Sequence, residues 1–503
     1  MRICVVVPTG NHLETAGVRI RYQRIAAHLE AMGHSFSLQI IDDLQLRPKP
    51  DCDVVLISKC YDARGIVAAA EMRAQGVQVG ADFFDDYYSQ VTDSRFVHLR
   101  QWLRDISGSL SFTLCSTPLM RRNLAELVPH VPCHMMNDPY KEFDTERVAE
   151  QVEAKLRRVR ATGIIDIGWF GIGDNPHFAV GLSDLGAYAG MLADLSRHGL
   201  SPRLSILTNR RALGIDRLQM LGRLPVPWRI EEWNEDAEHR LIAGSYACFL
   251  PVNAQRFSIV KSLNRAVTTL TGGAQVLSAG YPLYDAFGDF VYRGAADLAA
   301  DIAASKPRLR RTTLPAFLSL METSASPRTE AAGLAAFLQG LAMPQAVPGH
   351  ASVAILHGRT SIAAVHKFAQ RRGYLSVAGF KAGPELNYDI KPCLAPGTGR
   401  PSVQLSPPAM RMLKPDLAAK AVLNIAANGR QAHYLPLPDE LAAMTERGAG
   451  LVPDSDALFL SDYEADLADL PRLVSHFCAG VRVVLSEPAS PYWSSAAAAR
   501  GAA

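Results

Sequence analysis

The sequence predicts an α/β protein made of doubly wound, largely parallel β-sheets, and two observations support this prediction. Short, almost continuous apolar runs such as 2–8 and 53–58 recur along the first 150 residues. Stretches of helical period lie between these runs, among them 63–75, which stops at Gly76. Strands that are apolar throughout are buried on both faces, and their alternation with helices is typical of parallel sheets.

The same pattern divides the chain into successive units. Further strands of the first unit are expected at 37–41, 77–83 and 111–116. A charged helix over 144–162, without a strong apolar face, marks the passage to a second unit. The strands expected in that unit are 164–171, 203–208, 246–252, 274–279 and 289–292. The second unit is therefore also an α/β sheet, with its last helices ending near residue 342.

A third segment follows a Pro-containing linker at 343–350. A Pro- and Gly-rich interval at 391–410 interrupts this segment and is expected to be a long surface loop. Its expected strands are 352–357, 374–380, 456–461 and 481–486. We therefore predict three domains, the third a smaller α/β domain of unassigned role, with the boundaries 1–155, 160–342 and 350–503.

Composition excludes several classes of protein. The chain has 503 residues, of which 48% are hydrophobic and 20% charged, which excludes a disordered or fibrous protein. A formal net charge of +3 argues against a nucleic-acid partner. The eight cysteines form no C-x-x-C pair, which predicts reduced thiols in the cytoplasm. No run approaches the about 20 apolar residues that a membrane-spanning helix needs.

The second unit contains a basic corner between a strand and a helix. A strand ends near residue 252, and a helix is expected to start near Lys261 and Ser262. Helix N-termini present free backbone N–H groups and suit a phosphate. Lys261 and Arg265 are four residues apart, so they share one helix face and can neutralise a diphosphate. The alternative is a basic helix face that is simply solvated.

The segment 257–284 resembles the donor-side signature of retaining GT-B glycosyltransferases of the family 4, or group 1, type. Other pieces that look like this family follow in its order, and together they cover about the first 340 residues: 17–34, 53–88, 115–124, 137–139 and 167–178. The residues that fit the signature are Lys261, Ser262, Arg265, Gly273, Val276, Ser278 and Ala279. The resemblance implies a GT-B fold, in which two Rossmann-like domains face each other across a cleft.

The resemblance also implies an activity. It is the transfer of a sugar from a nucleotide sugar to an acceptor hydroxyl with retained configuration, in bacterial-type glycan or glycoconjugate assembly. The implied reaction needs no metal or other cofactor, and its acceptor is a glycan, a lipid-linked glycan or a protein. The implied location is the cytoplasm; peripheral attachment to the inner membrane and homo-oligomerisation remain open.

Two departures from the family favour a second interpretation. Thr268 stands where the family has a glutamate that holds the ribose, and Gln275 replaces a proline. A threonine cannot accept two hydrogen bonds as an anion. The alternative is therefore a non-catalytic GT-B scaffold or a subunit that binds sugar nucleotides. A sugar-nucleotide 2-epimerase of the same architecture is a third hypothesis, weakened by the lack of its acidic and histidine residues.

These interpretations give the candidate site residues. Lys261 and Arg265 would stabilise the leaving diphosphate, and Asp86 would present a carboxylate to the acceptor, although Asp86 can equally cap a helix. The residues expected to bind the donor are Gly171, Gly173, Asn175, Ser262, Asn264, Thr268 and Gly273. The residues expected in the loop after the first strand are His12, a candidate base, and Gly17, Arg19 and Arg21, which would approach the diphosphate or the acceptor. For the two arginines the alternative is a solvated helix face.

Overall fold

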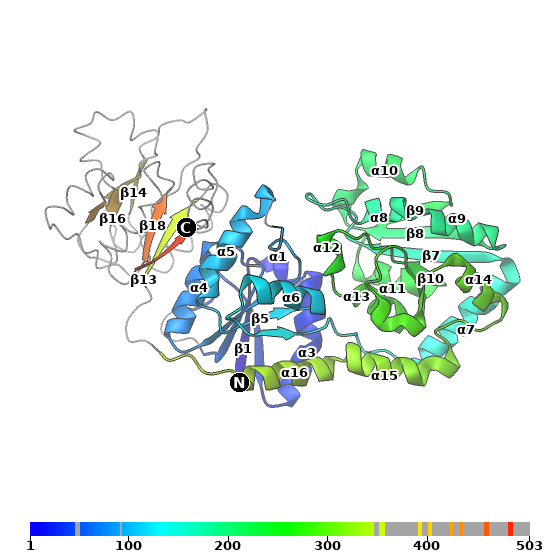
Figure 1. Ribbon diagram of the computed structural model, residues 1–503, viewed down its shortest axis with the longest axis horizontal. Coiled ribbons are helices and arrows are strands. Elements are labelled where there is room, and N and C mark those ends of the chain that lie inside the picture. Colours follow the sequence, from blue (N-terminus) through cyan, green and yellow to red (C-terminus); the bar gives the residue numbers. More distant parts are fainter. Residues whose placement is uncertain are drawn as a thin grey trace.

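The computed structural model describes residues 1–45, 51–90 and 93–346, and the backbone of seven short strands beyond them. Within residues 1–346 it contains two six-stranded sheets, and every strand pairing in both sheets is parallel. Figure 1 shows the two domains side by side, with α15 (Leu314–Ser324) and α16 (Pro327–Gly340) running along both. The predicted class, two Rossmann-like domains of a GT-B fold, is confirmed.

The first sheet has the order β2-β1-β3-β4-β5-β6. Its strands are β1 (Arg2–Val7), β2 (Ser35–Ile40), β3 (Val54–Ser58), β4 (Gln78–Phe83), β5 (Phe112–Cys115) and β6 (Cys133–Met135). Its helical segments are α1 (Gly10–Leu13), α2 (Ala16–Val18), the π-helical η1 (Arg19–Gln23), α3 (Arg24–Ala31), α4 (Ala63–Ala74), the 3-10 turn η2 (Ser94–Phe96), α5 (Val97–Ser107) and α6 (Pro118–Leu127). The five strands predicted for this unit are all present, and β6 is an additional one.

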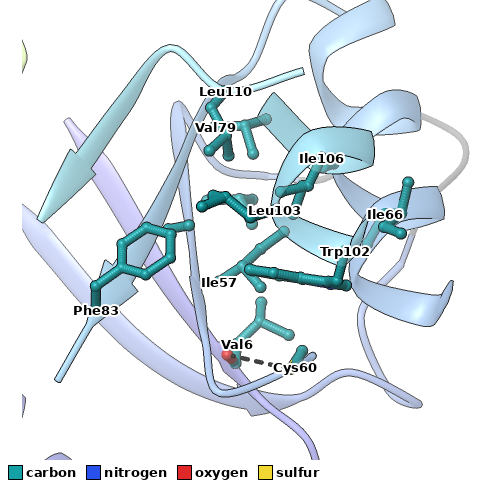
Figure 2. Close-up of a cluster of buried hydrophobic side chains, with 14 of the residues drawn as sticks. Val6, Ile57, Cys60, Ile66, Val79, Phe83, Trp102, Leu103, Ile106 and Leu110 are labelled. Carbon is teal, nitrogen blue, oxygen red and sulfur yellow. Dashed lines mark hydrogen bonds between the residues drawn. The ribbon is translucent and has the colours of Figure 1, made fainter. Parts of the chain in front are cut away.

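Side chains of successive residues along β1 enter two different cores, because neighbouring side chains in a strand point to opposite faces. Cys4 and Val6 lie in the core that α4, α5 and α6 cover. Figure 2 shows part of this core, with Trp102 and Ile106 of α5 packed over the sheet. Val5 lies on the other face, in a core with α3 and α16. Helices on both faces explain why the strands are apolar throughout.

The second sheet has the order β12-β11-β10-β7-β8-β9. Its strands are β7 (Ile164–Gly171), β8 (Ser201–Thr208), β9 (Trp228–Glu232), β10 (Ala247–Phe249), β11 (Gln275–Leu277) and β12 (Val291–Tyr292). Its helical segments are α7 (Thr145–Thr162), α8 (Leu182–Ala187), α9 (Gly190–Arg197), η3 (Arg210–Leu213), α10 (Ile215–Leu221), α11 (Glu235–Gly244), α12 (Arg256–Ile259), α13 (Asn264–Thr271), η4 (Asp285–Phe290), α14 (Ala295–Ala303) and η5 (Arg311–Thr313). The five predicted strands are again present, together with β9.

The helices α7 and α16 lie where the chain passes from one domain to the other. The charged helix α7 does have a buried face, because Val148 and Val152 lie in a core of the second domain. Helix α16 returns to the first domain, where Leu334 and Leu338 pack against β1 and β3. The predicted boundaries assign residues 145–155 of α7 to the first domain and α16 to the second. The observed packing instead places these residues of α7 with the second domain and α16 with the first. The domain boundaries remain predictions.

Beyond residue 346 the structure describes three groups of strands. β13 (Ser352–His357) lies between β18 (Ala457–Ser461) and β19 (Val481–Leu485) in a parallel sheet. These three strands coincide with the strands predicted at 352–357, 456–461 and 481–486. β14 (Lys391–Leu394) pairs with β15 (Pro401–Gln404), and β16 (Leu423–Ile425) pairs with β17 (His433–Leu435), both antiparallel. The expectation of a simple loop over 391–410 is therefore wrong, since two paired strands occupy part of it. The strand predicted at 374–380 lies outside the described residues.

Candidate functional site

The carboxyl ends of the strands in the two sheets carry the residues that join the domains. The hydroxyl of Thr117, which caps α6 after β5, donates to the carbonyl of Val260 at 3.0 Å. Arg95 donates from Nη1 to the carbonyl of His177 at 2.9 Å. In open α/β sheets, ligands bind outside the carboxyl ends of the strands. The contacts between the domains therefore surround the region in which a ligand is expected.

Four aromatic side chains form one side of this junction. Phe178 and Phe257 of the second domain stack at 4.3 Å between ring centroids. Tyr87 of the first domain lies 5.3 Å from Phe257, and Phe96 lies 5.5 Å from Phe178. Burial, aided by the charge of Asp85, raises the pKa of Tyr87 to about 12. We call Tyr87, Phe96, Phe178 and Phe257 the aromatic junction.

The predicted donor residue Asn175 serves this junction. Its Oδ1 accepts hydrogen bonds from the backbone N–H groups of His177 and Phe178 at 2.8 and 3.1 Å. Its side chain also hydrogen-bonds Tyr87 of the first domain. Asn175 thus orders the loop that carries Phe178, and its polar atoms are engaged by protein groups.

Lys261 takes part in the contact between the domains, but it lies in the turn between α12 and α13 and not at the start of a helix, so the expected helix face shared with Arg265 is wrong. Its ammonium group forms an ion pair with the carboxylate of Asp85, which follows the end of β4. The ammonium nitrogen also lies 3.8 Å from the centroid of the Phe257 ring. Burial raises the pKa of Asp85, but Lys261 and then Lys59 outweigh it, so the net pKa is below the usual range. Asp85 is therefore an anion that pairs with Lys261 of the other domain and also experiences the charge of Lys59 of its own domain.

Arg265 extends from α13 toward the end of β7. Its guanidinium carbon lies 5.2 Å from the Trp169 ring and 5.6 Å from the Phe170 ring. The Nε and Nη2 atoms are buried and have no hydrogen-bond partner among the described residues. A buried donor without an acceptor is costly, and a charged one more so. Two donors of Arg265 are therefore buried without an acceptor among the described residues.

Gly171 lies next to Arg265 at the end of β7. Its φ is +148°, a conformation that favours glycine. A Cβ atom built at this position would lie 3.5 Å from the guanidinium of Arg265. The guanidinium of Arg265 thus lies next to the bare backbone at the end of β7. Lys261, Arg265 and Gly171 are the predicted residues that the structure brings to this side of the junction.

The other predicted donor residues divide into two groups. Ser262, Asn264 and Thr268 are half-buried, Ser262 in the turn before α13 and the other two on the helix itself. Gly173 and Gly273 instead serve the fold: a Cβ on Gly173 would lie 2.3 Å from Thr208 Oγ1, and one on Gly273 would lie 2.7 Å from Gln151 Oε1 of α7. These two glycines are required for close packing.

Asp86 does not face the junction, contrary to expectation. Its side chain is fully buried, and Oδ1 accepts from the backbone N–H groups of Tyr88 and Ser89. Oδ2 accepts from the hydroxyl of Ser89 and from Asn123 Nδ2. With both oxygens occupied, Asp86 orders the turn after β4, and its neighbour Asp85 presents the carboxylate to the second domain.

Arg21 is likewise a structural residue and does not reach a ligand. Its side chain is fully buried and donates to both carboxylate oxygens of Asp82, at 2.5 and 3.0 Å. Its remaining donors reach the carbonyls of Cys115 and Met136, and Ser116 Oγ. The periodicity of the sequence predicted a position on a helix but not which face was buried.

The remaining residues of the first loop lie near the junction. His12 Nδ1 lies 2.8 Å from Thr9 Oγ1, and burial followed by the charges of Lys59 and Arg64 lowers its pKa. His12, Gly17 and Lys59 line a narrow hollow at the ends of β1 and β3. Arg19 forms an ion pair with Glu235 of the second domain at 2.9 Å.

Two charged residues near the junction, Lys59 and Asp85, are not among the candidates named from the sequence. Lys59 follows β3 with a φ of +59°, a strained conformation for a side chain other than glycine. Its ammonium lies 4.9 Å from the centroid of the Phe84 ring and acts electrostatically on Asp85. The sequence around Ser58 and Cys60 does not indicate this role of Lys59, because a positive φ can be recognised only in the folded structure. Asp85 is the neighbour of the predicted Asp86, and the sequence could not show which of these two adjacent acids faces outward.

Neither a cluster of metal-binding side chains nor a membrane-spanning helix is present among the described residues. No three histidine, cysteine, aspartate or glutamate side chains in this part of the chain are grouped so that they could hold a metal ion. No helix in the same residues has the length and apolar character required to cross a bilayer. The expectation that no metal is needed remains untested.

No known protein family and no curated protein matches the sequence. Among solved structures, trehalose-6-phosphate synthase OtsA is 11% identical, and the match covers 68% of this chain and 100% of that chain with a TM-score of 0.47. Sucrose-phosphate synthase from Thermosynechococcus elongatus is 12% identical over 67% of this chain and 98% of that chain, with a TM-score of 0.47. Anabaena HepE in complex with UDP-glucose is 11% identical over 68% and 100%, with a TM-score of 0.46. Because these values are low, the fold assignment rests on the two sheets of this chain, and membership of the retaining GT-B family 4 stays a prediction.

Proposed function

We propose that this chain is a glycosyltransferase that moves a sugar from a nucleotide sugar to an acceptor hydroxyl. The observation that carries the proposal is the guanidinium of Arg265, whose buried Nε and Nη2 lack an acceptor among the described residues and which lies next to the bare backbone of Gly171. A diphosphate supplies the acceptor oxygens that these donors lack, because arginine and phosphate form paired hydrogen bonds.

Lys261 supplies a second positive charge near this region. It lies four residues before Arg265, and its ammonium reaches the first domain at Asp85. As the bond between the sugar C1 and the phosphate oxygen breaks, the electron pair stays on the diphosphate. Two preorganised cations stabilise that developing charge, and a single contact of this kind is worth roughly 2.7–4 kcal/mol of barrier in comparable sites. We propose that this step needs no metal ion.

The acceptor completes the reaction. Its hydroxyl oxygen forms the new bond to C1 on the face that the diphosphate leaves, so the configuration is retained, and its proton passes to a phosphate oxygen. We propose a glycan, a lipid-linked glycan or a protein as acceptor, in bacterial-type glycan or glycoconjugate assembly in the cytoplasm. Attachment to the membrane surface and homo-oligomerisation belong to the same proposal as open alternatives.

A second candidate function is binding of a sugar nucleotide without turnover. Thr268 supports it, because a hydroxyl replaces the carboxylate that the resembling family uses for the ribose. The ion pair between Lys261 and Asp85 also supports it, since an occupied ammonium is a weaker group for the leaving diphosphate.

The test is the release of nucleoside diphosphate by the full chain from a panel of nucleotide sugars, with and without glycan acceptors and in the presence of EDTA. We expect release by the wild type and its loss in Lys261→Ala and Arg265→Gln. Lys306→Ala is the matched control, since this lysine is exposed in the turn after α14 and should leave the release unchanged. Binding of a nucleotide sugar without release from any donor would favour the second candidate. Absence of binding across the panel would refute both.

A further inference from the structure

We propose that Asp85 is an internal anion that occupies Lys261 until a diphosphate displaces it, and that it then passes to Lys59. This inference rests on the proposed function and assigns a positioning role to two residues outside the predicted signature. It concerns the order in which charges are exchanged when the donor binds.

Asp85 and Lys261 are suited to such an exchange because their contact is only partly buried. The exposed fractions of their side chains are 23% and 38%, so neither charge is locked in the interior. The buried pair of Arg21 and Asp82 differs, since both side chains have 0% exposure. Ion pairs at half-exposed positions contribute little stability, and a ligand anion can therefore replace the carboxylate.

Asp85 has a second cation on its own domain. Lys59 acts on the Asp85 carboxylate electrostatically, together with Lys261. The Lys59 ammonium is positioned over Phe84, the residue next to Asp85 in sequence. Displacement from Lys261 therefore does not leave the carboxylate without a positive neighbour. The strained backbone of Lys59, with a φ of +59°, is consistent with selection for the position of this side chain.

The exchange links binding to the contact between the domains. Asp85 joins the first domain to Lys261 of the second, next to the aromatic junction. When a diphosphate takes the Lys261 ammonium, this ion pair between the domains is replaced by contacts to the ligand. The released carboxylate remains on the first domain.

The test measures the binding of inorganic pyrophosphate and of UDP, GDP and ADP to the full chain by calorimetry in EDTA. We expect Asp85→Asn to bind the recognised diphosphate roughly two- to fivefold more tightly than the wild type, the range that a half-exposed ion pair allows. Asp85→Ser serves as a second variant if the first is poorly folded. Equal affinity in the wild type and in a folded Asp85 variant would overturn the exchange while leaving the proposed function intact. No diphosphate binding in any variant would instead overturn the proposed function.

Two further variants separate charge exchange from a general loosening of the domains. Arg95→Gln removes another hydrogen bond between the domains, the one to the His177 carbonyl, without touching Lys261. We expect no gain in affinity for this control, and an equal gain would overturn the exchange. Lys59→Gln should weaken binding by roughly threefold in the wild type but not in the Asp85→Asn background, because its role is to receive Asp85. Equal weakening in both backgrounds would mean that Lys59 contacts the ligand itself, which also contradicts the proposal.

Discussion

Arg21 and Asp82 form an ion pair with no solvent-exposed surface beneath the loop that follows β1. The Nε atom of Arg21 lies 2.5 Å from one carboxylate oxygen, and Nη2 lies 3.0 Å from the other. The hydroxyl of Tyr22 donates to the same carboxylate at 2.7 Å. This arrangement fixes η1 to the end of β4 and so holds the loop with Gly17 and Arg19 at the junction between the domains.

Replacing Arg21 is expected to destabilise the protein strongly. Arg21→Met leaves the Asp82 carboxylate buried without its cation, a situation that typically costs about 3–5 kcal/mol. We expect a matching fall in the free energy of unfolding, measured by urea denaturation. Arg19→Met is the matched control, since its ion pair with Glu235 is partly exposed and should cost less than about 1 kcal/mol. Similar losses in the two variants would contradict the structural role of Arg21.

Arg265 is expected to behave in the opposite way. Its buried Nε and Nη2 have no partner among the described residues, so Arg265→Met removes a desolvation cost. We expect the free energy of unfolding to stay within about 1 kcal/mol of the wild type or to rise, as at many binding sites. Diphosphate affinity should fall at least about tenfold, because charge-assisted hydrogen bonds are lost.

Arg64→Met provides the comparison for Arg265. Arg64 is also buried, but it is paired with Asp62 at 2.8 Å and with Asp42 at 3.2 Å. Its replacement should lower stability and leave diphosphate affinity unchanged. If Arg265→Met destabilised the protein as much as Arg64→Met while diphosphate binding persisted, Arg265 would be structural.

The extent to which sequence predicts this protein differs between the fold and the site. The strands of both sheets could be predicted, because burial on both faces leaves an apolar run that is visible in one dimension. The short edge strands β6 and β9 were missed, since His134 and Glu231 interrupt the apolar pattern there. The sequence also did not show that α16 packs on the first domain, because an amphipathic pattern does not identify the surface that its apolar face contacts.

The site was predicted in part, and the errors share a physical cause. Spacing singled out Lys261 and Arg265, but for a wrong reason: Arg265 lies on α13, whereas Lys261 lies in the turn before it, so the two cations do not share a helix face. Adjacent acids are a different case: Asp85 faces Lys261 of the other domain, whereas Asp86 is enclosed in its own turn. Only the turn geometry distinguishes the two, and it depends on contacts with residues far along the chain.

The aromatic junction is expected to control how closely the domains approach. Phe178 stacks on Phe257 at 4.3 Å within the second domain and on Phe96 of the first domain at 5.5 Å. Phe178→Ala removes the aromatic contacts between the domains that pass through this ring, each worth roughly 0.5–1.5 kcal/mol beyond its buried area. We expect a larger radius of gyration in small-angle X-ray scattering and faster limited proteolysis.

Phe290→Ala is the matched control for the junction. Phe290 packs on Phe317 inside the second domain, at 5.4 Å between ring centroids. Its replacement should lower the unfolding temperature without changing the radius of gyration of the folded protein. An unchanged radius in Phe178→Ala would show that other contacts, such as Thr117 to Val260, suffice to hold the domains together.

His134 is expected to make the return of α16 to the first domain sensitive to acid. The imidazole stacks on Phe337 of α16 at 4.8 Å, and its buried Nε2 has no partner among the described residues. Burial, helped by the charges of Arg21 and Arg121, lowers the pKa of His134 to about 4. The unfolded chain, with an ordinary histidine pKa near 6.5, then binds more protons than the folded chain between these values. Stability contributed by the neutral ring is therefore complete above about pH 6.5 and is lost as the pH falls toward 4.

His134→Phe tests this effect by keeping the ring stack and removing the titration. We expect the unfolding temperature of the wild type to fall between pH 6.5 and 4 more steeply than that of His134→Phe, with little difference between the two at pH 8. His198→Gln, which changes an exposed histidine, should follow the wild type throughout. Parallel curves for His134→Phe and the wild type would assign the acid sensitivity to the carboxylates that are ion-paired in the folded state, because those lose their charge in the lower part of the same range.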